Sequence, residues 1–241
     1  MDIFLFMLIG FISGTAKAGV KGIGTVTVPI FALVFGAKAS TGILLPILIF
    51  ADTGAVLYYY KQVDWYQLKK ILPAAIIGVV LATWFGNSIS ELTFKYLMGS
   101  LILICIILLL LWEQYGKDTV AEKYKSFGYG MGVGLGFTTM IGNLAGPLMN
   151  IYMLMIKLPK TVFIATSAIF FYIINIFKIP FHIYVWKTIT FQTFLLDLLA
   201  IPAIIVGLYF GVYVVKMMSE KFFKGLVLIT TALSAFVLLL N

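Results

Sequence analysis

Long apolar runs follow one another along almost the whole chain, and only short polar segments separate them. An α-helix of about 20 residues crosses the roughly 30 Å hydrocarbon core of a bilayer. The runs of about this length are predicted to be membrane-spanning helices: Thr41–Tyr60, Ile71–Asn87, Phe94–Trp112, Val162–Ile179, Phe194–Val215 and Phe222–Leu240. The pattern therefore predicts an all-α integral membrane protein.

The composition supports this class and excludes others. Charged residues make up 11% of the chain, less than half of the roughly 25% that is usual in soluble proteins. The net charge of +8 comes from lysines that lie mostly between the apolar runs, so we predict no nucleic-acid partner. Cys105 is the single cysteine and can form neither an internal disulfide nor a zinc site. The sequence predicts no cofactor and no bound metal.

Two further apolar stretches are too long to be single helices. Residues Ile3–Phe35 and Ser126–Ile156 would each form a helix of about 46–50 Å, which exceeds what ordinary tilt accommodates. Each stretch contains glycines followed by a proline, at Gly22–Thr25 before Pro29 and at Gly142–Pro147. We therefore expect each to be a hairpin of two helices, spanning or re-entrant, that meet at a non-helical tip.

The two halves of the chain resemble each other. At a spacing of 118 residues Gly24 matches Gly142 and Pro29 matches Pro147, and beyond the hairpins the same order continues at slightly larger spacings. Matches in a constant order over both halves indicate an internal repeat. The sequence thus divides into a first membrane repeat at residues 1–112, a polar linker at 113–125 and a second membrane repeat at 126–241.

The lysines favour an inverted arrangement of these repeats. If each hairpin enters and leaves on one side, the lysines in the loops collect mainly on one face, which the positive-inside rule assigns to the cytoplasm. If each broken stretch crosses once instead, the repeats are parallel and the lysines are nearly balanced. The first scheme gives each repeat a broken or re-entrant hairpin plus three transmembrane helices, an arrangement typical of transporters.

Two lysines precede the first tip and suggest an anion site. Lys17 and Lys21 are four residues apart, so they share a helix face. Their repeat partners at the 118-residue spacing are Leu135 and Thr139, so the charge is confined to one half. Ammonium groups beside glycine amides at helix N-termini can bind an anion. The alternative is that both lysines extend to the membrane interface. The predicted tip residues are Gly22, Gly24, Thr25, Gly142, Asn143 and Gly146.

Three other polar residues lie inside or at the ends of apolar runs. Asp52 is expected to balance the charge of the lysines, with Lys21 as its favoured partner, or to carry a coupling proton, although a structural ion pair is equally open. Asn175 is its repeat counterpart, and Lys178 lies on the same helix face as Asn175. We therefore include Thr139, Asn175 and Lys178 in the candidate substrate site. His182 is expected in a loop and Asp197 at the membrane interface, both outside the site.

The glycine-rich segments resemble a known family. Gly10–Gly14 followed by Gly19–Pro29 resembles the first signature of the sulfite exporter TauE/SafE family, and Gly134–Pro147 resembles the second. The resemblance implies a multi-pass protein of the bacterial inner membrane that exports sulfite or a related anion such as an organosulfonate. In the family a glycine cluster commonly fills both tips, whereas here Thr25 and Asn143 follow the glycines.

Together these features predict a secondary transporter that exports sulfite or a small sulfonate by alternating access. Its partners are the lipid bilayer and the anion, and the glycine stripes allow a homodimer. The alternatives are a permease or channel for carboxylates or other small anions, and a membrane assembly subunit that transports nothing. An enzyme is not expected, because no nucleophile and base lie together at membrane depth.

Overall fold

The computed structural model describes residues 3–20, 23–115, 125–223, 225–226 and 229, and within these ranges it contains helices and no strands. The α-helices are α1 (Ile3–Lys17), α2 (Thr27–Phe35), α3 (Ala37–Tyr59), α4 (Trp65–Asn87), α5 (Glu91–Tyr115), α6 (Lys125–Gly142), α7 (Ala145–Met155), α8 (Lys160–Pro180), α9 (Phe191–Leu198) and α10 (Ile201–Met217). Shorter helical turns are η1 (Ile23–Val26), η2 (Tyr60–Gln62) and the π-helical η4 (Phe181–Val185).

Several helices are long and apolar enough to cross a membrane, so the chain is a multi-pass membrane protein. Within the described ranges they are Ala37–Gln62, Trp65–Asn87 and Lys160–Val185, and α9 with α10 meets the same criterion as a pair bent by 48°, either a broken span or a re-entrant loop. The prediction of one continuous helix at Phe194–Val215 is therefore wrong. Pro202 lies in the first turn of α10, where its missing N–H costs no hydrogen bond, so a new helix can begin there. Most of the predicted run Phe222–Leu240 lies outside the described residues.

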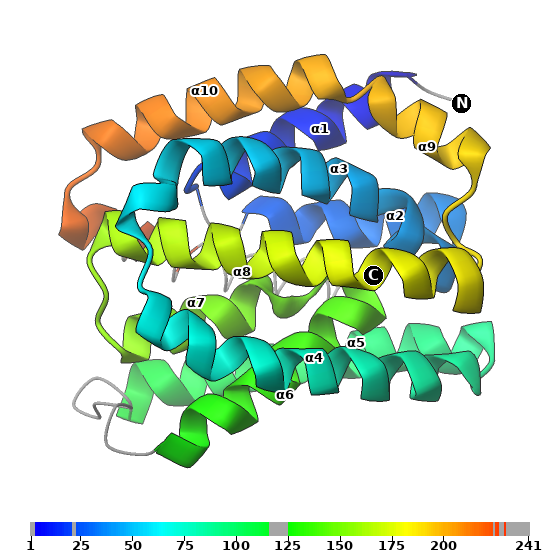
Figure 1. The fold of residues 1–241 in the computed structure, drawn as a ribbon, viewed down its shortest axis with the longest axis horizontal. Helices are drawn as coiled ribbons and strands as arrows, with labels where there is room; N and C mark the ends of the chain where they lie inside the picture. Colours follow the sequence, from blue (N-terminus) through cyan, green and yellow to red (C-terminus); the bar gives the residue numbers. More distant parts are fainter. Residues whose placement is uncertain (1–2, 21–22, 116–124, 224, 227–228, 230–241) are drawn as a thin grey trace.

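Both over-long apolar stretches break, as the sequence predicts. The first leaves the α-helical conformation after Lys17, and the second does so between Gly142 and Ala145. In Figure 1 the chain reverses direction at each break, so α1 and α2 run in opposite directions, as do α6 and α7. Each pair is therefore a hairpin. Figure 1 also shows α3 antiparallel to α8.

Glycines allow close contacts between the two halves of the chain. Helix α1 packs most extensively on α10, and α6 does so on α4. A Cβ added at Gly14 would collide with the Ile204 carbonyl, and one at Gly136 would collide with the Ala75 carbonyl. These backbones touch because glycine has no side chain. The glycine stripes are thus used within the chain and do not support the predicted homodimer.

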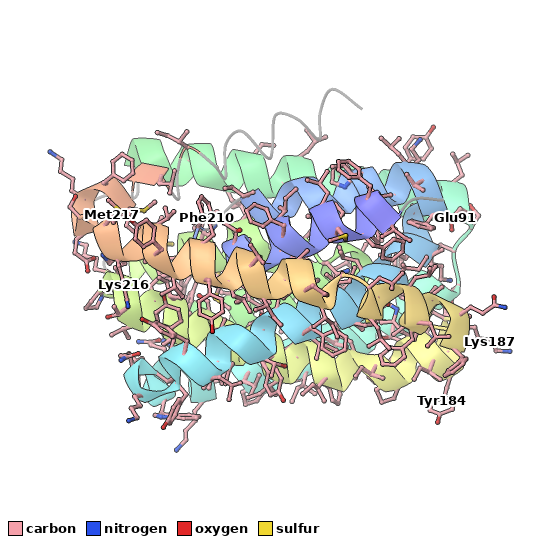
Figure 2. The ribbon with its side chains drawn as sticks, turned by 90° about the horizontal axis from the view of Figure 1, so that it is seen from above. Glu91, Tyr184, Lys187, Phe210, Lys216 and Met217 are labelled. Carbon is pink, nitrogen blue, oxygen red and sulfur yellow. The ribbon has the colours of Figure 1, made fainter. Side chains whose placement is uncertain are left out.

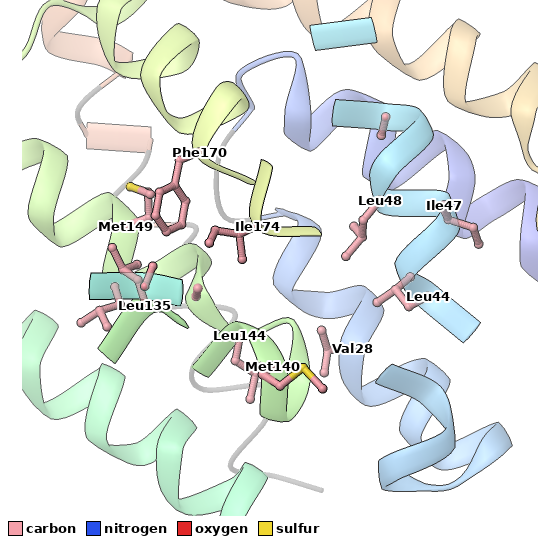
Figure 3. Packing of buried hydrophobic residues seen from close by; sticks show 14 of the residues in the cluster. Val28, Leu44, Ile47, Leu48, Leu135, Met140, Leu144, Met149, Phe170 and Ile174 are labelled. Atoms are coloured by element: carbon pink, nitrogen blue, oxygen red, sulfur yellow. The ribbon is translucent and has the colours of Figure 1, made fainter. Parts of the chain in front are cut away.

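The buried core lies between the two hairpins and the long helices α3 and α8. Figure 3 shows Val28 on α2, Leu48 on α3, and Met140 and Leu144 around the second break, all directed into this interior. The outer faces carry exposed apolar side chains instead, such as Phe210 on α10 in Figure 2. An apolar exterior is what lipid contact requires.

Two lysines with equivalent contacts, Lys38 and Lys160, lie at opposite ends of the molecule. Lys38, at the start of α3, donates its backbone N–H to the Glu91 carboxylate. Its ammonium lies 5.3 Å from the centre of the Trp186 ring. Lys160, at the start of α8, is held in the same way by Glu220. Lys160 lies at one end of the continuous α8–η4 helix, and Trp186, which contacts Lys38, lies at the other. About 39 Å of helix therefore separates the surroundings of the two lysines. Figure 2 likewise places Lys216 and Glu91 at opposite ends.

Candidate functional site

A small cavity lies where both helix breaks approach α3 and α8. Its volume is about 80 Å³. One buried water needs about 10–15 Å³ of such volume, so the cavity has room for a few waters or one small anion. Its lining comes from both halves of the chain: Ser13, Ala16, Lys17, Gly24 and Leu48 from the first, and Thr139, Asn143, Gly146, Asn150, Phe171 and Asn175 from the second.

Lys17 supplies a positive charge to the cavity wall. It is the last residue of α1, and its Nζ lies 2.7 Å from Oδ1 of Asp52. The lysine side chain is 13% exposed, whereas Asp52 is fully buried. The ammonium also lies 4.2 Å from the centre of the Phe171 ring, which makes a cation–π contact. The ammonium is therefore fixed at the cavity but retains some access to it.

The two halves of the chain meet at the buried carboxylate. Asn175 on α8 donates from Nδ2 to Oδ2 of Asp52 on α3 at 2.8 Å. The Asp52 carboxylate thus contacts the lysine through one oxygen and the amide through the other. The sequence comparison pairs Asp52 with Asn175, and the structure brings these two residues into direct contact.

Lys178 holds the second break together. It is fully buried and therefore does not extend to the membrane interface. Its ammonium donates to the Thr139 carbonyl at 2.8 Å, to Oδ1 of Asn143 at 2.6 Å and to Oδ1 of Asn175 at 3.4 Å. The Thr139 hydroxyl oxygen lies at 3.3 Å as a further acceptor, so acceptors are available for every N–H of the group. The lysine therefore acts on the cavity through the residues that line it.

Asn143 occupies the turn at which α6 ends. Its φ of 56° lies in the left-handed region, which asparagine tolerates better than most residues. Its backbone N–H donates to the Thr139 carbonyl at 2.9 Å and closes the helix, as is common for a left-handed C-terminal residue. Its side chain also donates to the Thr41 carbonyl on α3 at 3.0 Å. The tip is thereby fixed to both α3 and α8.

Most predicted site residues that the structure describes come together here. Lys17, Gly24, Thr139, Asn143, Gly146 and Asn175 line the cavity, and Asp52 and Lys178 bond to lining residues. Gly142 lies behind the wall, beside Leu144 and Met98. Lys21 and Gly22 lie outside the described residues, and only the backbone of Thr25 is described, within η1.

Some lining residues were not predicted. Ser13 lies four residues before Lys17 on the same helix, so the spacing that relates Lys17 to Lys21 also points to Ser13. Asn150 is a polar residue inside an uncharged apolar stretch, which is itself a signal. Nothing in the sequence pattern marks Leu48 or Phe171, because apolar residues are expected throughout.

Two predictions about residues outside the site are wrong. His182 is buried within η4 and shares a hydrogen bond of 2.8 Å with the Thr188 hydroxyl, instead of lying in a loop. Proline restricts the residue before it, yet here a π-helical turn continues the helix past Pro180. Asp197 is fully buried in α9, against α3 and α1, instead of lying at the interface.

The charges around the cavity favour an anion. The Lys17 ammonium lies at the cavity wall and pairs with the Asp52 carboxylate, whereas Nζ of Lys178 bonds to the wall residues Thr139, Asn143 and Asn175. The N-terminal end of α7 adds a partial positive charge beside Gly146. No group of three His, Cys, Asp or Glu side chains that could hold a metal is found among the described residues. The site is therefore suited to a small anion at membrane depth.

A bundle of apolar spans around a charged cavity at two broken helices is the architecture of a membrane transport protein. The family model for the sulfite exporter TauE/SafE matches residues 3–238, so the chain belongs to this family. The family consists of transporters of sulfite or related anions, not enzymes. No curated protein and no solved structure gives a further match.

Proposed function

We propose that this protein exports sulfite or a small sulfonate and binds the anion in the cavity between the two helix breaks. The observation that carries the proposal is the Lys17 ammonium at the cavity wall, where it is partly exposed although its counter-ion Asp52 is fully buried. An entering anion can therefore approach the lysine without first separating the ion pair. The amides of the α7 N-terminus, beside Gly146, and the side chains of Asn143 and Asn150 complete the polar wall.

An inverted repeat explains how such a site would be exposed alternately on the two sides. The packing supports a two-fold relation, because the close glycine contacts between the two halves occur in equivalent pairs. Gly14 meets Ile204 as Gly136 meets Ala75, and Gly207 meets Phe11 as Gly78 meets Val133. In these pairs, each position in α6 comes 122 residues after its counterpart in α1, and each position in α10 comes 129 residues after its counterpart in α4.

The spacing of 122 residues revises the equivalence of the site residues. It pairs Lys17 with Thr139, and both line the cavity. Beyond the breaks the helices agree with the predicted spacing of 118, because α2 begins at Thr27 and α7 begins at Ala145. Equivalent positions at one shared site are what a transporter with two repeats would require.

The ends of the molecule support inversion of the two repeats. Lys38 and Lys160 are also 122 residues apart and have equivalent carboxylate contacts, yet they lie at opposite ends of the bundle. Movement of one repeat against the other would then open the cavity first to one side and then to the other. We assign the end that carries Lys160 and Lys216 to the cytoplasm, because most lysines of the loops belong to it. The membrane is the inner membrane of a bacterium.

Sulfite flux into proteoliposomes tests the proposal. The wild type should show saturable flux, and Lys17→Gln should reduce kcat/KM about 10–100-fold, since a hydrogen bond to a charged group contributes about 1.5–3 kcal/mol. Lys216→Gln is the matched control, because this exposed lysine lies at the end of α10, and it should change little. Flux measured with and without a pH gradient reports proton coupling.

Other outcomes would identify the alternatives. Flux that rises linearly with sulfite concentration would indicate a channel, and a preference for acetate over sulfite would indicate a carboxylate permease. A purified protein that passes none of these anions would support a subunit without transport activity. Sulfite flux that is unaffected by Lys17→Gln would retain the transporter and reject the site.

A further inference from the structure

Ser13 is a polar residue of the cavity wall whose hydrogen bond is missing. It lies on α1, is 1% exposed and lines the cavity. Its Oγ has no hydrogen-bond partner among the residues that the structure describes. Most buried hydroxyl groups in proteins are hydrogen-bonded, so this serine calls for an explanation.

Other helical hydroxyls in this protein bond to the backbone. Thr15, two residues further along α1, donates to the Phe11 carbonyl at 2.9 Å, and Thr83 and Thr138 donate to carbonyls four residues earlier in the same way. The Ser13 hydroxyl could likewise donate to a carbonyl of the preceding helical turn, but it makes no such hydrogen bond. A buried donor without a hydrogen bond destabilises the fold. Its presence at a cavity wall is explained if a ligand accepts its hydrogen bond.

The position of Ser13 relative to Lys17 indicates what kind of ligand this is. The two residues are four apart on one helix, so they share a face with Cβ atoms about 5–6 Å apart. Both line the same cavity, which is large enough for only one small anion. Two donors side by side suit an anion with several oxygens, because each donor can bind an oxygen of its own.

We propose that Ser13 is a substrate-binding residue, whose hydroxyl donates a hydrogen bond to one oxygen of the bound oxyanion while Lys17 contacts another. This pair of donors selects oxyanions over halides, since a single-atom anion cannot offer separate acceptors to both. The proposal rests on the proposed binding of an anion in the cavity, and it adds the class of anion that this part of the wall selects.

Two serine variants test the role of the hydroxyl. Ser167 is the matched control, because it is also fully buried and its Oγ also lacks a partner within the described chain, but it does not line the cavity. Ser13→Ala and Ser167→Ala are compared with the wild type for binding of sulfite, methanesulfonate and chloride to the purified protein, measured by calorimetry at one pH. Sulfite flux is measured in parallel in proteoliposomes.

We expect Ser13→Ala to weaken the binding of sulfite and methanesulfonate at least about tenfold and to leave chloride binding nearly unchanged. Ser167→Ala should alter none of the three. Ser13→Cys keeps the size of the side chain but donates only weakly, so it should fall between the wild type and Ser13→Ala. This variant carries the test if Ser13→Ala does not fold.

The results separate the two proposals. Oxyanion affinity that is equal in the wild type and Ser13→Ala, or a loss that is equal for chloride and oxyanions, would overturn the role of Ser13. Wild-type sulfite flux in either case would leave the proposed function standing. Conversely, oxyanion binding that depends on Ser13 in a protein without sulfite flux would support the site and reject sulfite export.

Discussion

The ion pair between Lys17 and Asp52 allows stability and transport to be separated in one experiment. At an N–O distance of 2.7 Å, their Coulomb attraction is about 6 kcal/mol for an effective dielectric constant of about 20. Desolvation of both groups opposes this attraction, so the pair itself adds little net stability. Removal of one partner is different, because it leaves the other charge in the interior without this counter-ion.

The exposures of the two side chains predict unequal effects. In Lys17→Met the fully buried Asp52 carboxylate loses its ion pair, and we expect a loss of about 3–5 kcal/mol in the free energy of unfolding. For a chain of this size, this corresponds to a decrease in Tm of roughly 6–20 °C. Asp52→Asn should cost less, because the Lys17 ammonium is 13% exposed and keeps its contact with Phe171. In the double variant neither member of the ion pair is left without the other, so it should recover most of the lost stability.

The assay is a double-mutant cycle on protein in detergent, followed by thermal unfolding, with sulfite flux measured on the same four proteins. The double variant should be stable and yet inactive, because it lacks the ammonium that faces the cavity. A coupling free energy of at least about 2 kcal/mol is expected between the two sites. Losses of stability that simply add, with a double variant as unstable as the sum of the single variants, would refute the reasoning.

Four further predictions concern other parts of the structure. Lys178→Met should reduce the free energy of unfolding by about 3 kcal/mol and abolish flux, since several buried oxygens lose their donor. Gly14→Ala should lower Tm because its Cβ would collide with a carbonyl of α10, whereas Gly99→Ala, with open space around it, should stabilise α5 by up to about 1 kcal/mol. Asp197→Asn should raise Tm, because both carboxylate oxygens are buried without a hydrogen-bond partner among the described residues. In competition assays, methanesulfonate should inhibit sulfite flux more strongly than the dianion sulfate.

Length and polarity made the main features of this fold predictable. The over-long apolar stretches had to break, and the glycines marked both places, because a helix has a fixed rise per residue and a bilayer has a fixed thickness. Lys17 and Asp52 were recognisable in the same way, since a charge inside an apolar run needs a partner.

The sequence could not determine which residues meet. Lys17 and Lys21 share one helix face, and the sequence pattern favoured Lys21 as the partner of Asp52, whereas the structure pairs Lys17 with it. The spacing of the repeat was ambiguous for a similar reason. Glycines recur every two residues along α6, so a match one helical turn away looks equally good. The loops show why no single spacing fits: residues 18–26 separate α1 from α2, whereas only residues 143–144 separate α6 from α7.

The difference between Asp52 and Asn175 bears on which anion the proposed site would accept. If the repeats were identical, Asp52 would face a second aspartate where Asn175 stands, and two buried carboxylates would repel both each other and an anion. The amide removes one negative charge and still donates a hydrogen bond to Asp52. The single carboxylate is then paired with Lys17, and no second buried carboxylate opposes an anion in the proposed site. A dianion brings more negative charge into a buried site than a monoanion does, which is costly at membrane depth. For the proposed anion site, the replacement of one carboxylate by an amide therefore favours a singly charged oxyanion, such as hydrogen sulfite or a sulfonate.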